Sequence, residues 1–373
     1  MRIAVPVETK PGEARVALVP DLAGKLIKQG LSVVIAAGAG FKSGFTDTAY
    51  QEVGVEISTD DVLANADVVL SVQPIEIANL KSLKPGAVTI SFLPVNSSFE
   101  ILQAGADARI TQFSLELIPR ISRAQSMDAL TSQALCAGYK AALIGAELSP
   151  RFFPLLMTAA GTVTPAQVLV LGAGVAGLQA IATAKRLGAV VSAYDVRPSS
   201  KDEVISMGAS FVELELEALE GAGGYAREMT PERAAKQREL LTPYISKSDV
   251  VITTAAVPGK PAPLLITTEM MSGLKPGSVV VDLAAESGGN VAGSVAGQIV
   301  ELNGVKIWGG KDVPSSLPFH ASQLYAKNVV NLLNLMLDLE SKQIRLDFDD
   351  EIIAASAVTH DGQIRVESAG GKK

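Results

Sequence analysis

Histidine, cysteine and tryptophan are scarce in this sequence, whose 373 residues include two histidines, one cysteine and one tryptophan. Cys136 cannot form a disulfide within the chain, and two scattered histidines cannot complete a four-ligand Cys/His zinc site with it. A reaction with a histidine base would have to recruit His320 or His360, both in the last sixth of the chain. We therefore expect no disulfide scaffold, no metal site and few groups for acid–base chemistry.

Positive charge and membrane-length apolar runs are also in short supply. The sequence has 32 Lys and Arg residues and 39 Asp and Glu residues, and the resulting net charge of −7 argues against a nucleic-acid-binding surface. The N-terminus lacks the apolar stretch of a signal peptide, and the longest uncharged apolar run, 168–184, is shorter than a membrane span of about 20 residues. We expect a soluble, cytoplasmic protein that does not insert into the membrane. Its mean hydropathy of +0.30 favours a buried oligomer interface.

Short β-type runs alternate with helical patches in the first 115 residues. A helix is expected at 22–29, and a long alanine-rich helix without proline at 129–148. Repeated alternation of strand and helix predicts a parallel sheet covered by helices on both faces. The strands expected here are 2–5, 31–35, 68–72 and 88–92.

A second alternating block follows, and its pattern is typical of a doubly wound nucleotide-binding domain. A helix expected at 322–339 is long enough to return the chain to the first domain. We predict an α/β protein of two Rossmann-like doubly wound domains, the first discontinuous (1–130 plus 312–373) and the second at 131–311. The strands expected in the second block are 168–171, 190–194, 250–254, 279–283 and 305–308.

A G-x-G-x-x-G motif stands between the strand expected at 168–171 and a helix expected at 178–187. Gly172 permits a tight turn, Gly174 lets a pyrophosphate approach the backbone, and Gly177 lets the helix pack close to the strand. The helix N-terminus beside Val175 and Ala176 offers unpaired N–H groups and partial positive charge to phosphates. The alternative is a glycine-rich turn that binds no ligand.

Asp195 ends the second strand of this block, 18 residues after Gly177. Its carboxylate can accept both hydroxyls of an adenosine ribose and would repel a 2′-phosphate, which favours NAD(H) over NADP(H). Arg197, which follows Val196, favours NADP(H) instead, because a nearby arginine can accommodate a 2′-phosphate. Since the acid occupies the strand-end position, we predict NAD(H) as the cofactor and 131–311 as the NAD(H)-binding domain.

Polar side chains cluster in the segment 119–131, where Arg120, Gln125, Asp128 and Thr131 could reach a common site. From the spacing alone, a polar helix cap is favoured, in which Asp128 or Ser126 satisfies exposed N–H groups.

The same segment resembles the signature loop of the NAD(H)-binding component of proton-translocating nicotinamide nucleotide transhydrogenase. The resemblance covers nearly the whole chain. It implies that Arg120, Gln125, Asp128 and Thr131 are the catalytic residues at the nicotinamide end. Gln125 would contact the partner-side nucleotide, while Arg120 and Asp128 would orient the NAD(H) ring. Thr131 stands where the family usually has serine. The other matching stretches are 8–17, the glycine motif, 222–229, 257–263 and 281–290.

The resemblance also implies further contacts with the nucleotide. A family loop that folds over NAD(H) is matched here by Gly224 and Tyr225. Gln237 and Ala256 match positions that line the nucleotide, and Ala256 is smaller than the residue expected there.

The reaction implied by the resemblance is hydride transfer from NADH to NADP⁺ bound on a partner. The chain would form a homodimer and join an NADP(H)-binding subunit and a membrane-embedded subunit that conducts protons. These partners would place it at the periphery of the inner (cytoplasmic) membrane and couple hydride transfer to proton translocation.

Alanine dehydrogenase shares this fold and is the main alternative. It oxidises an amine and hydrolyses an imine, which requires proton transfers at the substrate. The resemblance would place a lysine where this chain has Gln73, a histidine at Pro94 and an aspartate at Glu286, while Arg15, which would hold a substrate carboxylate, is retained. Proline has no side-chain donor or acceptor, so these positions favour the transhydrogenase. A non-catalytic NAD-binding regulatory protein is a third alternative.

Overall fold

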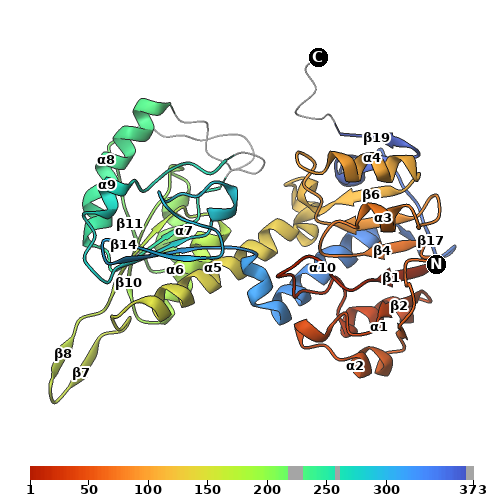
Figure 1. Cartoon of the computed structure of the whole chain (residues 1–373), viewed down its shortest axis with the longest axis horizontal. Coiled ribbons are helices and arrows are strands. Elements are labelled where there is room, and N and C mark those ends of the chain that lie inside the picture. Colours follow the sequence, from red (N-terminus) through yellow and green to blue (C-terminus); the bar gives the residue numbers. More distant parts are fainter. Residues whose placement is uncertain (217–229, 257–260, 367–373) are drawn as a thin grey trace. The chain divides into compact units, whose positions relative to one another are not determined.

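The chain folds into two compact units in the computed structural model (Figure 1). Unit 1 contains Met1–Gln133 and Pro314–Lys373, and unit 2 contains Ala134–Val313. Each unit is built on its own mainly parallel sheet, which confirms the predicted α/β fold with two Rossmann-like domains and a discontinuous first one. The residues that the structure describes are 1–216, 230–256 and 261–366.

Unit 1 holds an eight-stranded sheet in the order β19-β18-β6-β5-β4-β1-β2-β3. The strands from β6 to β3 in this order are parallel, and β18 and β19 extend one edge antiparallel. The parallel order is that of a doubly wound sheet, whose growth reverses direction between β1 and β4. The strands are β1 (Arg2–Val5), β2 (Ser32–Ala36), β3 (Glu56–Ser58), β4 (Val68–Leu70), β5 (Val88–Ser91), β6 (Thr111–Ser114), β18 (Ala357–His360) and β19 (Gln363–Ile364).

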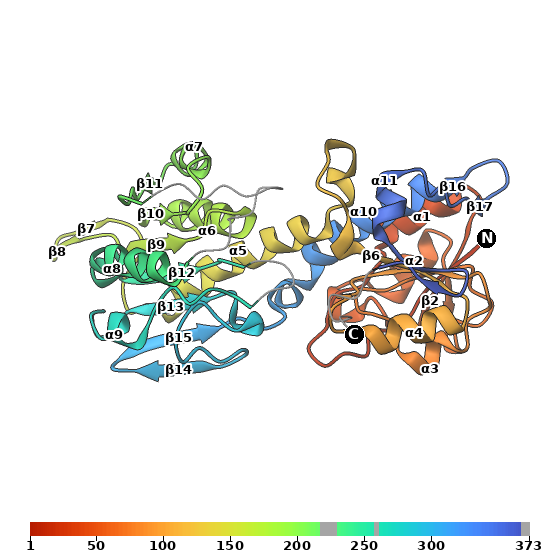
Figure 2. The ribbon, with the colours of Figure 1, turned by 90° about the horizontal axis from the view of Figure 1, so that it is seen from above.

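Successive strand residues of unit 1 alternate between two apolar cores. Ile3 and Val5 pack in the core shared with α1, α10 and α11, whereas Ala4 belongs to the core shared with α3 and α4. Figure 2 shows these two helix groups on opposite faces of the sheet. The period-2 alternation is that of strands buried on both faces. The helices are α1 (Pro20–Lys28), α2 (Asp47–Glu52), α3 (Ile77–Leu80), α4 (Phe99–Asp107), α10 (Pro318–Met336) and α11 (Glu351–Ser356).

Unit 2 holds a seven-stranded sheet in the order β11-β10-β9-β12-β13-β15-β14, which is parallel except for β14. Val168 and Val170 pack in one core with Ile181 of α6, whereas Leu169 and Leu171 pack in another core that α8 covers. The strands are β9 (Gln167–Leu171), β10 (Val190–Tyr194), β11 (Ser210–Phe211), β12 (Val250–Thr253), β13 (Val279–Asp282), β14 (Ile299–Leu302) and β15 (Val305–Gly309). Helix α5 (Ala129–Leu148) begins in unit 1 and continues into unit 2. The other helices are α6 (Val175–Arg186), α7 (Ser200–Ser206), α8 (Pro231–Lys247) and α9 (Thr268–Met271).

Three helices begin earlier than the sequence pattern predicts. Helix α1 begins at Pro20 instead of residue 22 and ends at Lys28 instead of residue 29. Helix α6 begins at Val175 instead of residue 178, because Gly174 is its N-cap and the helix starts inside the glycine motif. Helix α10 begins at Pro318 instead of residue 322 and ends at Met336 instead of residue 339. A proline at the first helical position costs no hydrogen bond, since the N–H groups of that turn have no partner in the helix. Within the described ranges, no helix combines the length and apolarity needed to cross a bilayer.

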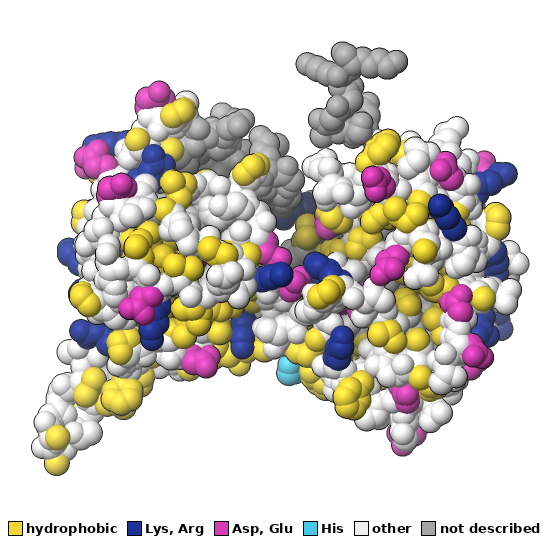
Figure 3. All heavy atoms as spheres, in the orientation of Figure 1, with side chains coloured by type: hydrophobic (Ala, Val, Ile, Leu, Met, Phe, Trp, Pro, Cys, Tyr) yellow, Lys and Arg dark blue, Asp and Glu magenta, His cyan; other side chains and the backbone are white. Residues whose placement is uncertain are grey.

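A β-hairpin formed by β7 (Leu156–Thr158) and β8 (Gly161–Val163) projects from the body of unit 2 (Figures 1 and 2). Every residue of both strands is exposed, and Met157 in β7 and Phe152 before it are 78% and 62% exposed. Figure 3 shows hydrophobic side chains on the hairpin and at its base. A two-stranded hairpin is only marginally stable by itself, and a contiguous exposed apolar surface marks a contact site.

Candidate functional site

The glycine turn after β9 has the geometry that the motif predicts. Gly172 has a φ of +101°, a conformation that favours glycine, and its carbonyl accepts a hydrogen bond of 3.0 Å from the Thr254 hydroxyl. A Cβ on Gly172 would lie 2.6 Å from that hydroxyl oxygen. A Cβ on Gly177 would lie 1.9 Å from the Gly172 carbonyl oxygen. Helix α6 therefore packs against the turn at a distance that only glycine allows.

The first turn of α6 leaves room for a ligand. A Cβ on Gly174 would meet nothing within 4 Å, and this N-cap residue provides no side-chain cap. Val175 is exposed and Ala176 half-buried. Because the first N–H groups of a helix have no partner within it and carry partial positive charge, this turn fits the pyrophosphate of a dinucleotide.

Gly138 in α5 is a component of this turn that sequence reasoning missed. A Cβ on Gly138 would lie 2.0 Å from the Ala176 carbonyl oxygen, so α5 crosses the start of α6 in backbone contact. Glycine in a helix interior costs roughly 0.5–1 kcal/mol relative to alanine. A glycine inside an alanine-rich helix, where alanine would be the better helix former, was the signal that could have identified this close approach.

Asp195 directly follows β10, and four hydrogen bonds hold its carboxylate. Oδ2 accepts from the N–H of Ala173 in the glycine turn at 2.7 Å, and Oδ1 accepts from the backbone N–H of Arg197 at 2.9 Å. The Arg197 guanidinium donates from Nε to Oδ1 at 2.9 Å and from Nη2 to Oδ2 at 3.1 Å. The hydrogen bond to Asp195 is the main reason why the pKa of Arg197 is raised.

The Asp195 carboxylate thus lies beside the glycine turn, as predicted, but it is already hydrogen-bonded to the guanidinium of Arg197. The Asp195 side chain is 7% exposed and that of Arg197 is 21% exposed. The guanidinium donates to both oxygens of the carboxylate, one N–H group to each. Val196 between them is half-buried. The contact of each of these residues with a nucleotide remains a prediction.

The other predicted nucleotide contacts lie on different elements of unit 2. Ala256 is exposed, three residues after the end of β12. Gln237 on α8 is 2% exposed, and its Oε1 accepts a hydrogen bond of 3.3 Å from the Tyr194 hydroxyl, whose pKa burial raises to about 12. Gln237 supports the end of β10, and its contact with the nucleotide remains a prediction. Gly224 and Tyr225 lie outside the described residues.

The loops after β12 and β13 are held by Asn290, another residue without a role in the sequence-based site. Asn290 is fully buried, and its side-chain amide accepts from the Ala255 N–H at 3.1 Å and donates to the Ala255 and Pro263 carbonyls at 2.8 Å each. Its backbone N–H donates to Asp282 at 3.1 Å, and Asp282 also accepts from the Thr253 hydroxyl at 3.1 Å. These bonds fix the carboxyl ends of the strands, where doubly wound sheets bind their ligands.

The four residues predicted for the nicotinamide end all belong to unit 1. Arg120 and Gln125 are exposed, and Gln125 lies in the 3₁₀ helix Ser122–Met127. Asp128 caps α5, with Oδ1 accepting from the Thr131 N–H at 2.8 Å and Oδ2 from the Thr131 hydroxyl at 2.7 Å. This is the helix cap that the spacing alone favours. The roles of the four side chains toward a nucleotide remain predictions.

The arginine that an alanine dehydrogenase would use for a substrate carboxylate is buried among acceptors of this chain. Arg15 is 6% exposed and donates to Glu13 from Nε and Nη2 at 2.8 and 2.6 Å, and from Nη1 to Gln133 at 2.9 Å. Burial acts to raise the pKa of Glu13, but the hydrogen bonds and charge of Arg15 outweigh it and lower this pKa to about 2. Gln73, at the lysine position, donates to Glu13 at 2.7 Å. Pro94, at the histidine position, is exposed.

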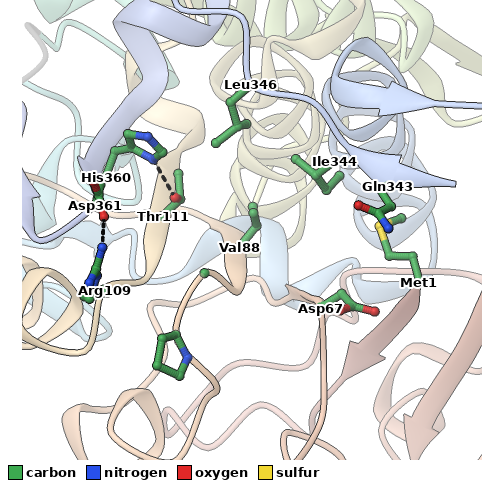
Figure 4. A pocket seen from close by; sticks show the side chains of 12 residues that line it. Met1, Asp67, Val88, Arg109, Thr111, Gln343, Ile344, Leu346, His360 and Asp361 are labelled. Atoms are coloured by element: carbon green, nitrogen blue, oxygen red, sulfur yellow. Dashed lines mark hydrogen bonds and ion pairs between the residues drawn. The ribbon is translucent and has the colours of Figure 1, made fainter. Parts of the chain in front are cut away.

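A hollow of about 600 Å³ opens in unit 1 at the edge where the parallel strands begin (Figure 4). His360 lines it, with Nδ1 3.0 Å from the Thr111 hydroxyl oxygen and its ring centroid 4.7 Å from that of Phe348. Ligands of doubly wound sheets bind at the opposite, carboxyl ends of the strands. His320 is exposed at the beginning of α10. Both histidines therefore have contacts that fit structural or surface positions.

The chain matches known proteins over nearly its whole length. Two family models match it, namely Alanine dehydrogenase/PNT, N-terminal domain, over residues 4–137, and Alanine dehydrogenase/PNT, C-terminal domain, over residues 141–367. A Rhodospirillum rubrum protein, named as the first piece of NAD(P) transhydrogenase subunit alpha, is 47% identical over 98% of this chain and 97% of its own. The crystal structure of transhydrogenase from Sinorhizobium meliloti is 42% identical, with a TM-score of 0.86 and 98% of both chains covered. Alanine dehydrogenase from Mycobacterium tuberculosis is 32% identical over 79% of this chain and 75% of its own.

Proposed function

We propose that this chain, which belongs to the alanine dehydrogenase/PNT family, is the NAD(H)-binding subunit of a proton-translocating nicotinamide nucleotide transhydrogenase. In this role it holds NADH while a hydride passes to NADP⁺ on a partner subunit. The observation that carries the proposal is an intact dinucleotide turn in a chain whose Gln73 and Pro94 replace the groups that an amine substrate needs. The 47% identity to a transhydrogenase subunit, against 32% to an alanine dehydrogenase, supports the same choice.

The nucleotide is held by unit 2 in this proposal. The open face at Gly174 and the free N–H groups of α6 receive the pyrophosphate. Asp195, fixed to the turn by the Ala173 N–H at 2.7 Å, accepts the hydroxyls of the adenosine ribose and repels a 2′-phosphate. Gln237, Ala256 and the segment with Gly224 and Tyr225 complete the contacts.

Hydride transfer asks for alignment and not for a protein acid or base. When bound, the two nicotinamides supply the chemistry: a hydride passes from C4 of NADH to C4 of NADP⁺, which leaves NAD⁺ and NADPH and takes no proton from a side chain. The protein must bring the carbons to about 3–3.5 Å and exclude water. Arg120 and Asp128 orient the NAD(H) ring and its carboxamide, while Gln125 contacts the partner-side nucleotide. Two bonds from Thr131 fix the direction in which the Asp128 carboxylate points.

The partners follow from the same proposal. A homodimer would cover the exposed apolar hairpin β7–β8, on which Met157 is 78% exposed. An NADP(H)-binding subunit and a membrane-embedded proton-conducting subunit would complete the enzyme and hold this chain at the periphery of the cytoplasmic membrane. The name of the Rhodospirillum rubrum relative, which designates one piece of an alpha subunit, describes that protein as a component of a larger enzyme.

The test compares two activities of the purified protein. Addition of a separate NADP(H)-binding transhydrogenase domain should produce hydride exchange between NADH and an NADP⁺ analogue, followed by absorbance. Incubation with NAD⁺ and L-alanine should produce no NADH. Robust oxidation of alanine without any partner would replace this proposal with an amino-acid dehydrogenase. Tight NADH binding without either activity would favour a regulatory protein.

A further inference from the structure

Two asparagine side chains converge on one backbone carbonyl in unit 1. Nδ2 of Asn328 and Nδ2 of Asn331 donate to the Ser126 carbonyl oxygen at 2.9 and 3.0 Å. Both asparagines belong to α10, one turn apart, while Ser126 lies about 200 residues earlier in the 3₁₀ helix Ser122–Met127. The two bonds use both lone pairs of the carbonyl, so this point of the loop is held from α10 alone.

The orientation of the Asn328 amide is forced by its partners. A backbone carbonyl can only accept, so the amide must present its NH₂ group to Ser126. Its Oδ1 then accepts from the Ser132 hydroxyl at 2.7 Å. Asn328 is 6% exposed. Asparagine is a poor helix former, and its presence inside a long helix is accounted for here by side-chain bonds that no apolar residue could make.

The loop around Ser126 is fixed on its other sides as well. Ala124 and Met127 are buried, at 0% and 7% exposure. The Arg123 guanidinium donates to both carboxylate oxygens of Asp350, at 2.5 and 3.1 Å. Gln125 lies between the buried Ala124 and the clamped Ser126, and its own side chain is exposed. The neighbouring residues are anchored and the direction of Gln125 is thereby set.

We propose that Asn328 and Asn331 are positioning residues that clamp the Ser126 carbonyl and thereby aim the Gln125 side chain for hydride transfer. This inference rests on the proposed function, because it takes Gln125 as the contact with the partner-side nucleotide. The clamp touches no nucleotide itself. It acts through the backbone of the residue that follows Gln125, and a displacement of about 1 Å at a reacting pair can reduce a rate roughly a hundred-fold.

The substitution Asn331→Ala tests the clamp without weakening the helix, since alanine is the better helix former. We expect hydride exchange with an NADP(H)-binding domain to fall about ten-fold, with the dissociation constant for NADH unchanged within about two-fold. Asn331→Gln keeps an amide donor and should recover some of the lost rate. Asn334→Ala, at an exposed position one turn further along α10, is the matched control and should behave as wild type.

A double-variant cycle with Gln125→Asn separates positioning from general structural support. If the clamp acts through Gln125, Asn331→Ala should add little to the loss that Gln125→Asn already causes. Full additivity of the two losses, or loss of NADH affinity in Asn331→Ala, would overturn the proposal.

Hydrogen exchange of the segment 122–128 provides a readout that does not depend on activity. Its amides should exchange faster in Asn331→Ala and not in Asn334→Ala. An unchanged exchange pattern would refute the clamp whatever the enzyme does. If the amides of Asn331→Ala exchange faster but Gln125→Asn transfers hydride at the wild-type rate, the role of Gln125 is refuted, and the positioning role of the clamp with it. That outcome would not affect the proposal that unit 2 binds NAD(H).

Discussion

Replacing Asp195 with alanine should shift the nucleotide preference from NADH toward NADPH, and the full shift should require Arg197. The guanidinium holds the carboxylate through Nε at 2.9 Å and Nη2 at 3.1 Å. The hydroxyls of an adenosine ribose would take over these acceptor positions when NADH binds. Without the carboxylate, Nε and Nη2 of Arg197 lose this acceptor at the end of β10, and a guanidinium can bind a phosphate with two parallel hydrogen bonds.

The magnitude for NADH depends on this exchange of donors. A hydrogen bond to a charged group contributes about 1.5–3 kcal/mol, so two bonds to a ribose would contribute up to about 6 kcal/mol. The diol, however, displaces two N–H donors of Arg197, and the net gain from Asp195 is correspondingly smaller. We expect Asp195→Ala to cost about 2 kcal/mol, or roughly thirty-fold in NADH affinity.

The magnitude for NADPH has two contributions. Two unit charges about 4 Å apart interact by about 4 kcal/mol at an effective dielectric constant of 20, and solvent screening reduces this to about 2 kcal/mol for a phosphate at an open edge. Removal of the Asp195 carboxylate should therefore improve NADPH affinity roughly thirty-fold. A hydrogen bond from the Arg197 guanidinium to the phosphate should add about 2 kcal/mol, a further factor of roughly thirty.

Fluorescence titration of NADH and NADPH with four proteins measures both contributions. Wild type, Asp195→Ala, Arg197→Ala and the double variant form a complete cycle, and the double variant should lack only the second thirty-fold gain for NADPH. Arg197→Ala is the matched control and should bind NADH at least as tightly as wild type, because the diol no longer competes with the guanidinium. Equal NADPH affinities of Asp195→Ala and the double variant would refute the phosphate role of Arg197. An unchanged preference in Asp195→Ala would refute Asp195 as the discriminating residue.

Four further predictions concern other regions of the chain. Gln125→Asn should cut hydride exchange with an NADP(H)-binding domain while leaving NADH affinity nearly intact; loss of NADH binding would make Gln125 a cofactor clamp instead. Gly177→Ala should destabilise unit 2 by about 3 kcal/mol in urea unfolding, because its Cβ would lie 1.9 Å from the Gly172 carbonyl oxygen. Gly174→Ala, whose Cβ would meet nothing within 4 Å, should unfold at nearly the same urea concentration as wild type and should lose NADH affinity. Burial raises the pKa of Glu8 to about 7, so the folded protein keeps a proton that the unfolded chain loses between about pH 4.5 and 7. The free energy of unfolding should therefore fall by about 3 kcal/mol as the pH rises through that window. Glu8→Gln should remove this component of the pH dependence of unfolding between pH 5 and 8, and an unaltered dependence would contradict the assignment. Met157→Asp should turn the proposed homodimer into a monomer in sedimentation, whereas Ile205→Asp on α7, also an exposed apolar position, should not.

Much of the fold follows from apolar runs in the sequence, and strand β6 is an exception with an identifiable cause. Strand β4 is a short run of apolar residues buried on both faces, so its pattern is visible in the sequence. Strand β6 has the sequence Thr-Gln-Phe-Ser and is equally buried. The N–H of its Gln112 donates to the Thr359 hydroxyl at 3.0 Å, a partner 247 residues away. Buried polar residues are satisfied by such distant partners, and a local pattern cannot reveal them.

The candidate site likewise has parts that could be predicted from the sequence and parts that could not. The turn at Gly172 could be predicted because the positive φ of Gly172 and the close approach at Gly177, whose Cβ would lie 1.9 Å from the Gly172 carbonyl oxygen, belong to one strand–turn–helix unit. The guanidinium of Arg197 on Asp195 could not, because two residues that suggest opposite nucleotide preferences turn out to neutralise each other. The clamp on the Ser126 carbonyl could not either, since it joins α10 to a loop some 200 residues earlier.

The glutamine at position 73 also changes the charge balance around Arg15. A lysine there, as in the alanine dehydrogenase pattern, would set two cations against Glu8 and Glu13. With Gln73, this position carries no charge, and Arg15 pairs with Glu13 at 2.6 Å. Burial, with a further contribution from the charge of Glu13, raises the pKa of Glu8 to about 7 and outweighs the hydrogen bonds from the Val72 and Gln73 N–H groups. The net charge of Glu8, Glu13 and Arg15 therefore approaches zero because Glu8 holds a proton, and not because a second cation occupies position 73. Arg15 can therefore remain as a buried structural charge with its carboxylate partner inside the chain, which is compatible with a reaction that needs no amino-acid substrate.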